Sequence, residues 1–208
     1  PCYWSTADRV LPRVGPERLA ASPSIAGGAA RPVHGAQAVL WRTGHWDRTG
    51  AAHQLLHDGV AGVSETRYLR AVALADRVTG LGCWFGTTHF VVGGDNITDP
   101  ARRRRILAAD LDALDGFLGR LRSTGRPVLF QLDANITPRS SIYPAFRAML
   151  RTHRAVLHGT HGVEYLLTIP APATTVQVRS AWTIPTARLR TDHEARGVTF
   201  RLVSGDAR

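Results

Sequence analysis

The chain has 208 residues, of which 44% are hydrophobic and 20% are charged, so its composition excludes wholesale disorder and allows one sizeable core. No uninterrupted apolar run is long enough to predict a membrane-spanning segment. All 26 basic residues are arginine and they outnumber the 16 acidic residues, so the formal net charge of +10 favours polyanionic partners such as nucleic acid.

The chain begins with a segment whose composition predicts irregular structure. Residues 1–35 are rich in Pro, Gly, Ala and Ser, which is typical of a lead-in loop with at most a short helix over 16–21. A strand is predicted over 36–41 and an irregular connection over 46–56. We expect a single domain from residue 36 to 203, followed by a polar tail at 204–208.

The middle of the chain predicts a β-hairpin followed by a long helix. Alternation over 68–75, a turn over 76–82 and an apolar run over 83–90 indicate the hairpin. Asp99 and Pro100 are typical of an N-cap and a first helical residue. Leucines then recur at spacings of three and four up to residue 122, which predicts one apolar helix face.

An apolar run interrupted only by Gln131 begins at Val128 and predicts a buried strand that ends with Asp133 and Asn135. Because side chains alternate along a strand, both are expected on the same side, where the acid can bind a hard cation and the amide an anionic oxygen. The alternative is an Asx turn that caps the strand end. Beyond Pro138 we predict a helix over 141–152 and strands over 162–169, 176–181 and 197–202.

Polar residues gather where the predicted strands end. In two stacked sheets these ends would converge on one rim, where acids can hold a divalent cation and histidines can move protons. Taken singly, each residue is equally explained by a local hydrogen bond or a turn cap. The set comprises His89, Asp133, Asn135, Glu164, Asp192 and His193.

Four short motifs occur in an order that resembles the endonuclease/exonuclease/phosphatase superfamily, also described as DNase I-like. That family has Thr-His, Gly-Asp-Phe-Asn, an Asp-Tyr strand and Ser-Asp-His in this order, and the resemblance spans residues 36 to 203. It implies an α+β fold, a four-layered α/β/β/α sandwich with its active site on one rim. The matching segments are Thr88-His89, Leu132-Asp133-Ala134-Asn135, Val163-Glu164-Tyr165 and Thr191-Asp192-His193.

The resemblance implies a metal and phosphate site. Asp133 would contact the metal or orient the attacking water, and Asp192 would be a metal ligand. Asn135 would bind the scissile phosphate, and Arg67 would face the substrate. Because the implied ligands are oxygen donors, Mg²⁺ or Mn²⁺ is the expected cofactor.

The resemblance also implies a proton-transfer site. His193 would contact the phosphate or act as the base for water, with Glu164 as its orienting acid. His89 would stabilise the charge that develops on the phosphoryl oxygens.

The sequence departs from the family at several positions. Gln131-Leu132 replaces the glycine before the acid, Ala134 an aromatic residue, Glu164 an aspartate and Thr191 a serine. The family's first strand, helix and strand, which ends in a Gln-Glu metal ligand, has no counterpart. The sandwich is therefore expected to be truncated at its N-terminus and completed by a missing N-terminal segment or a partner chain.

These features predict a magnesium-dependent phosphodiester hydrolase, specifically a nuclease that acts on DNA or RNA. The alternative is a noncatalytic DNase I-like binding or assembly module in a larger complex, inactive for want of the N-terminal metal ligand.

Overall fold

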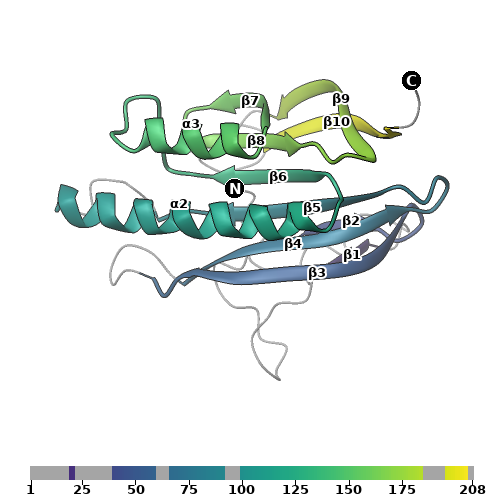
Figure 1. The fold of residues 1–208 in the computed structure, drawn as a ribbon, viewed down its shortest axis with the longest axis horizontal. Coiled ribbons are helices and arrows are strands. Elements are labelled where there is room, and N and C mark those ends of the chain that lie inside the picture. Colours follow the sequence, from purple (N-terminus) through teal and green to yellow (C-terminus); the bar gives the residue numbers. More distant parts are fainter. Residues whose placement is uncertain (1–18, 22–38, 60–65, 92–98, 185–194, 206–208) are drawn as a thin grey trace.

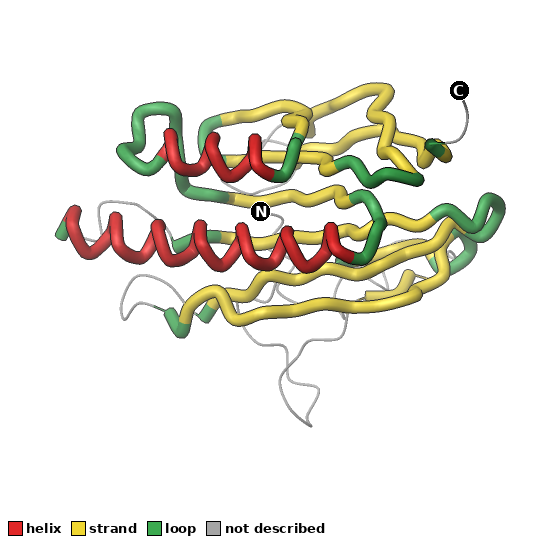
Figure 2. Tube along the Cα trace, in the orientation of Figure 1, coloured by secondary structure: helices red, strands yellow, loops and turns green. Residues whose placement is uncertain are grey.

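The computed structural model describes residues 19–21, 39–59, 66–91, 99–184 and 195–205 (Figures 1 and 2). Its centre is a six-stranded mixed sheet with the strand order β3-β4-β5-β6-β8-β7. Strands β5 and β6 are parallel, and the other neighbouring strands are antiparallel. The six strands are β3 (Trp46–His57), β4 (Arg67–Asp76), β5 (Gly82–His89), β6 (Val128–Asp133), β7 (Val156–His161) and β8 (Glu164–Ile169).

Helices α2 (Pro100–Ser123) and α3 (Tyr143–Thr152) cover one face of this sheet (Figure 1). The predicted N-cap is confirmed, because the Asp99 carboxylate accepts hydrogen bonds from the backbone N–H groups of Ala101 and Arg102. Among the described residues, no helix is both long and apolar enough to cross a membrane. The predicted apolar face of α2 is also confirmed, since the leucines at 107, 111, 114, 118 and 121 are all buried.

Two smaller antiparallel sheets lie against the other face of the large sheet. They are formed by β1 (Leu19–Ala21) with β2 (Leu40–Arg42), and by β9 (Thr174–Ile184) with β10 (Ala195–Ser204). The Phe200 ring of β10 lies 5.7 Å from the Phe85 ring of β5, measured between centroids. Trp41 of β2 packs against Val72 and Leu74 of β4. The described residues therefore stack as helices, large sheet and small sheets, which confirms the α+β class.

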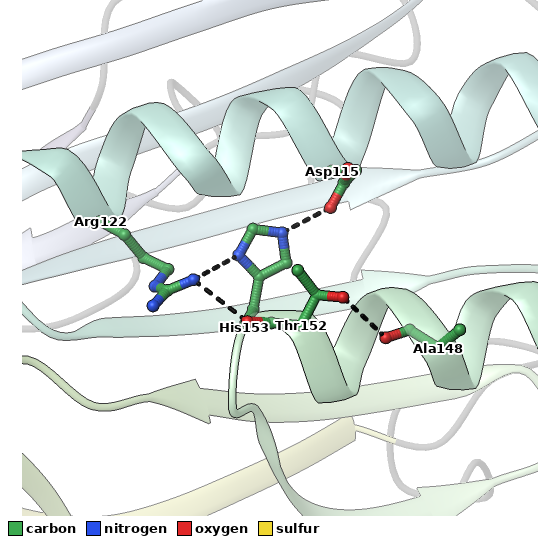
Figure 3. A network of polar contacts seen from close by, with 5 residues as sticks. All are labelled: Asp115, Arg122, Ala148, Thr152 and His153. Carbon is green, nitrogen blue, oxygen red and sulfur yellow. Dashed lines mark hydrogen bonds and ion pairs between the residues drawn. The ribbon is translucent and has the colours of Figure 1, made fainter.

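A buried histidine joins the two helices (Figure 3). His153, directly after α3, places Nε2 2.6 Å from the Asp115 carboxylate of α2. Its Nδ1 lies 3.2 Å from an Arg122 guanidinium nitrogen, which also donates to the Thr152 carbonyl. These contacts hold the C-terminal end of α3 against α2.

The structure corrects two predictions made for the connections and adds one strand. Residues 46–56 are not irregular, because they form most of β3, whose register with β4 shifts at two irregularities. Edge strands with such shifts lose the regular alternation by which strands are recognised. Residues 19–21 are a strand and not part of a short helix, and β7 was not predicted. The hairpin of β4 and β5 is confirmed, while the predicted domain limits at 35 and 203 stay predictions.

Candidate functional site

Three adjacent strands present His89, Asp133 and Glu164 side by side. His89 is the last residue of β5, Asp133 the last of β6 and Glu164 the first of β8. The strand register pairs His89 with Asp133, and Asp133 with Glu164. Residues at one level of neighbouring strands point to the same face of a sheet. The structure thus brings these three predicted site residues together as one row at the edge of the sheet.

The His89 imidazole and the Asp133 carboxylate form a buried pair. His89 Nε2 lies 3.3 Å from Asp133 Oδ2, and the two side chains are only 3% and 2% exposed. A carboxylate in this position orients the imidazole ring. Charge interactions are stronger here than at the surface, because burial lowers the effective dielectric constant.

Asn135 does not follow the alternation that was predicted for it. The strand ends at Asp133, and Asn135 has a φ of 49°, in the left-handed region. Its backbone N–H donates to Asp133 Oδ1 at 3.1 Å, which is the Asx turn named as the alternative. Its side-chain Nδ2 donates to the Phe90 carbonyl at 3.2 Å. The turn thereby brings Asn135 beside the His89 strand, and only one of its two amide hydrogens is used by that bond.

Three hydrogen bonds hold Phe90 and Val91, the two residues that follow His89. The Phe90 N–H donates to the Asp133 carbonyl at 2.8 Å, and the Phe90 carbonyl accepts from Asn135. The Val91 N–H donates to the Asp110 carboxylate of α2 at 3.1 Å. Asp110 is fully buried, and this burial raises its pKa to about 7. Asp110 thus positions the segment that carries His89, a role that its place on the helix did not predict.

A second polar row lies two residues deeper in the sheet. The register aligns Arg70 of β4 with Thr87 of β5, and Thr87 with Gln131 of β6. Arg70 is buried with its guanidinium 5.3 Å from the centre of the Tyr68 ring, and burial lowers its pKa. Counting back two residues from His89 and from Asp133 would have found Thr87 and Gln131, because strand faces repeat every two residues.

Arg67 lies at the start of β4 and is buried. Strand alternation gives it the face of Leu69, which packs in the core cluster with α2, whereas Arg70 shares the face of Thr87. The predicted substrate-facing role of Arg67 therefore stays a prediction. The predicted Asp192 and His193 lie outside the described residues.

Asp133 and Glu164 are the carboxylates of the row that could bind a cation. Oxygen donors of this kind suit Mg²⁺ or Mn²⁺. Within the ranges that the structure describes, however, no three His, Cys, Asp or Glu side chains group closely enough to hold a metal. The described donors thus fit part of a hard-cation site, and a complete site needs ligands from elsewhere.

Comparison of the sequence with family models and with curated proteins finds no match. Among solved structures, the fold matches the human Nocturnin catalytic domain with bound sulfate anion, with a TM-score of 0.65 and 16% identity over 96% of this chain and 77% of that chain. It also matches an endonuclease/exonuclease/phosphatase from Bacteroides vulgatus, with a TM-score of 0.56 and 13% identity over 80% and 70% of the two chains. The chain has the fold of the endonuclease/exonuclease/phosphatase superfamily. The fold also matches a mannosyl-6-phosphatase from Bacteroides thetaiotaomicron, with a TM-score of 0.52 and 13% identity over 80% of this chain and 70% of that chain.

These matches confirm the DNase I-like fold that the resemblance of the four motifs implied. Three of the motifs carry His89, Asp133 with Asn135, and Glu164, which come from separate parts of the sequence and meet at one end of the sheet. Their chemical roles follow from these positions only as a proposal.

Proposed function

We propose that the chain hydrolyses phosphodiester bonds, with nucleic acid as the substrate. The observation that carries the proposal is the row of His89, Asp133 and Glu164 at one edge of the sheet. Hydrolysis of a phosphodiester needs an activated water, a stabiliser for charge on the phosphoryl oxygens and a proton for the leaving oxygen. An imidazole and two carboxylates beside an amide are the groups that meet these needs.

Each side chain has a role in this proposal. His193, oriented by Glu164, removes a proton from the attacking water as the new P–O bond forms and the bond to the leaving oxygen breaks. His89, held by Asp133, donates a hydrogen bond to a phosphoryl oxygen and offsets its growing charge. Asn135 donates its remaining amide hydrogen to the same phosphate. The proton taken by His193 is available for the leaving oxygen.

A divalent cation, Mg²⁺ or Mn²⁺, is the cofactor that this donor set favours. Asp133 and Asp192 would hold it through carboxylate oxygens. When bound, such an ion neutralises charge on the phosphate and lowers the pKa of nearby water. The positive charge of the buried Arg70 in the adjacent row adds to the same electrostatic effect.

The preference for nucleic acid rests on charge. A net charge of +10 at neutral pH raises the local concentration of a polyanion and accelerates its association. A neutral or weakly charged substrate would gain little from such a surface.

The test is an assay of the purified chain on plasmid DNA, RNA and p-nitrophenyl phosphate in the presence of magnesium. We expect cleavage of a polynucleotide that Asp133→Ala and His193→Ala each abolish, while circular dichroism shows that both variants remain folded. Cleavage that is unaffected by either substitution would refute the assignment of the site.

The second candidate is a noncatalytic module that keeps the fold and binds through its basic surface. It is favoured by the lack of a three-ligand metal cluster within the described ranges. Calorimetric titration with magnesium discriminates the two candidates. A folded chain that binds no magnesium and cleaves no substrate, yet binds nucleic acid, would support the module.

A further inference from the structure

A cavity of about 290 Å³ lies between the start of α2 and the loop that connects β6 with α3. Its wall includes Arg103 and Arg104 from the helix, and Thr137, Arg139 and Ser140 from the loop. Arg103 and Arg104 are neighbours in the sequence, and the fold brings Arg139 from a distant segment to the same cavity. This cavity is separate from the row formed by His89, Asp133 and Glu164.

The positive charge of this arginine pocket is not balanced by acids. No Asp or Glu lines it, and the first turn of α2 contains no acidic residue. In the part of the chain that the structure describes, none of the three guanidinium groups forms an ion pair with a carboxylate. The adjacent Asp99 carboxylate does not line the pocket, and its Oδ1 accepts hydrogen bonds from two backbone N–H groups of α2. The pocket therefore has a net positive charge and suits an anion.

The loop wall of the pocket is held in one conformation. The Thr137 N–H donates to Ser140 Oγ at 2.9 Å, and the Ser140 N–H donates back to the Thr137 carbonyl at 2.9 Å. Tyr165 Oη donates to the Ile136 carbonyl at 2.7 Å and anchors the loop to β8. A wall with fixed hydrogen bonds loses little conformational entropy when a ligand binds.

The start of α3 adds a second favourable feature. Ile142 is its N-cap residue, and no side chain accepts a hydrogen bond at this end. The positive end of the helix dipole favours an anion here, while the Tyr143 N–H donates to the Ser140 carbonyl and Pro144 has no N–H. Ile142 also lines the pocket, so this helix end and the three arginines act on the same space.

The pocket lies near the proposed reaction site. Thr137 follows Asn135 by two residues, so chain geometry limits the separation of their Cα atoms to about 7 Å. Figure 1 shows the start of α2, the loop into α3 and the C-terminal end of β6 at the same end of the molecule. Neighbouring phosphates of one strand are spaced by roughly 3.4 Å along the helix axis of DNA, so a strand can reach both sites.

We propose that the arginine pocket binds a backbone phosphate of a polynucleotide, a few nucleotides away from the phosphate held beside His89 and Asn135. This inference rests on the proposed function for the identity of the ligand. Planar guanidinium groups bind phosphate oxygens through paired hydrogen bonds.

The test compares two triple variants of the full chain that remove the same charge. Arg103→Ala/Arg104→Ala/Arg139→Ala removes the pocket, and Arg147→Ala/Arg151→Ala/Arg179→Ala removes three exposed arginines elsewhere. Fluorescence anisotropy measures the Kd of a single-stranded oligonucleotide of about twelve residues over a range of salt concentrations. We expect the pocket variant to bind at least about tenfold more weakly at low salt and to reduce the salt slope by about 0.7, the change expected for one lost phosphate contact on a single strand.

The control triple is expected to change the Kd and the salt slope only slightly. Equal effects of the two triples would overturn the proposal, because binding would then follow total charge alone. Because the assay measures binding and not cleavage, it tests the pocket even if the chain hydrolyses no substrate. If circular dichroism shows that the alanine variant is unfolded, the corresponding lysine triple replaces it. That variant keeps the charge and loses the paired hydrogen bonds, so weaker binding than that of the control lysine triple supports the pocket, and equal binding refutes it.

Discussion

Asp110 of α2 accepts a hydrogen bond, at 3.1 Å, from the backbone N–H of Val91, which lies two residues after the end of β5. Only one carboxylate oxygen is used. The other, Oδ1, is buried and has no hydrogen-bond partner within the described residues. Burial is the main cause that raises the pKa of Asp110 to about 7, and the Val91 hydrogen bond opposes it.

This pKa makes stability depend on pH. The folded chain binds a proton at Asp110 more tightly than the unfolded chain does, so the stabilising effect is complete at acidic pH and is lost as pH rises towards 7. Above pH 7 the folded state holds a buried carboxylate, at a cost on the order of 4 kcal/mol for about three pKa units. We therefore expect Asp110→Asn, which keeps an acceptor for Val91, to be more stable than the unsubstituted chain at pH 8.

The advantage of Asp110→Asn should shrink as pH falls from 7 to 4. Urea unfolding at pH 5 and pH 8 measures both differences. Asp112→Asn, an exposed substitution on the same helix, is the control and should show no such dependence. If the two variants behave alike between these pH values, Asp110 is not the titrating group.

The His89–Asp133 pair predicts that a substitution can lower activity without lowering stability. Asp133→Asn keeps the shape of the side chain and an acceptor for the Asn135 N–H, but it removes the charge that orients and polarises His89. We expect the rate of phosphodiester hydrolysis to fall by about 100-fold or more, the scale of one acid–base group. The exposed Asp47→Asn is the control. Steady-state kinetics beside a melting curve tests this, and a rate within twofold of the control would contradict it.

Gly86 of β5 packs directly beneath Phe130 of β6. A Cβ added to Gly86 would lie 2.3 Å from two ring carbons, and the fully buried ring has no room to move. Gly86→Ala should therefore destabilise the chain by about 1–3 kcal/mol through overpacking. Gly119→Ala in α2 meets no atom within 4 Å and should be neutral or stabilising, since alanine favours helices. Chemical denaturation compares the two, and similar free energies of unfolding would contradict the expectation.

Local sequence signals predicted the elements whose patterns are regular. Asp99 and Pro100 mark the start of α2, and the leucine spacing marks the face that it buries. Strand β3 was missed because its register shifts at irregularities and its sequence contains Gly50 and two alanines, which have little preference for strands. Short-range patterns therefore identified the interior of the sheet better than its edge.

The candidate site was only partly visible in the sequence. The order of the motifs selected His89, Asp133 and Glu164, and the strand register places them together. Strand alternation was the wrong reason for expecting the Asn135 side chain beside Asp133. A turn with a left-handed residue sets its direction instead. Asp110 could not be predicted, since its importance depends on the packing of α2 against the end of β5, a contact between residues 19 positions apart.

His153 predicts a contribution to stability that is independent of catalysis. Its imidazole is buried and bridges Asp115 and Arg122 of α2, as Figure 3 shows. His153→Ala would remove both contacts and leave a cavity between the helices, so we expect a loss of about 1–3 kcal/mol of unfolding free energy. Asp115→Asn, which keeps an oxygen acceptor on a half-exposed side chain, should cost less than 1 kcal/mol or so, the range of exposed pairs. Urea unfolding gives both values.

Hydrolysis measured well below the melting temperature should be unchanged within about twofold in both variants, because the bridge lies on the helix face of the sheet and not in the row of His89 and Asp133. A large loss of activity in a fully folded His153→Ala variant would show that the two faces of the sheet are coupled.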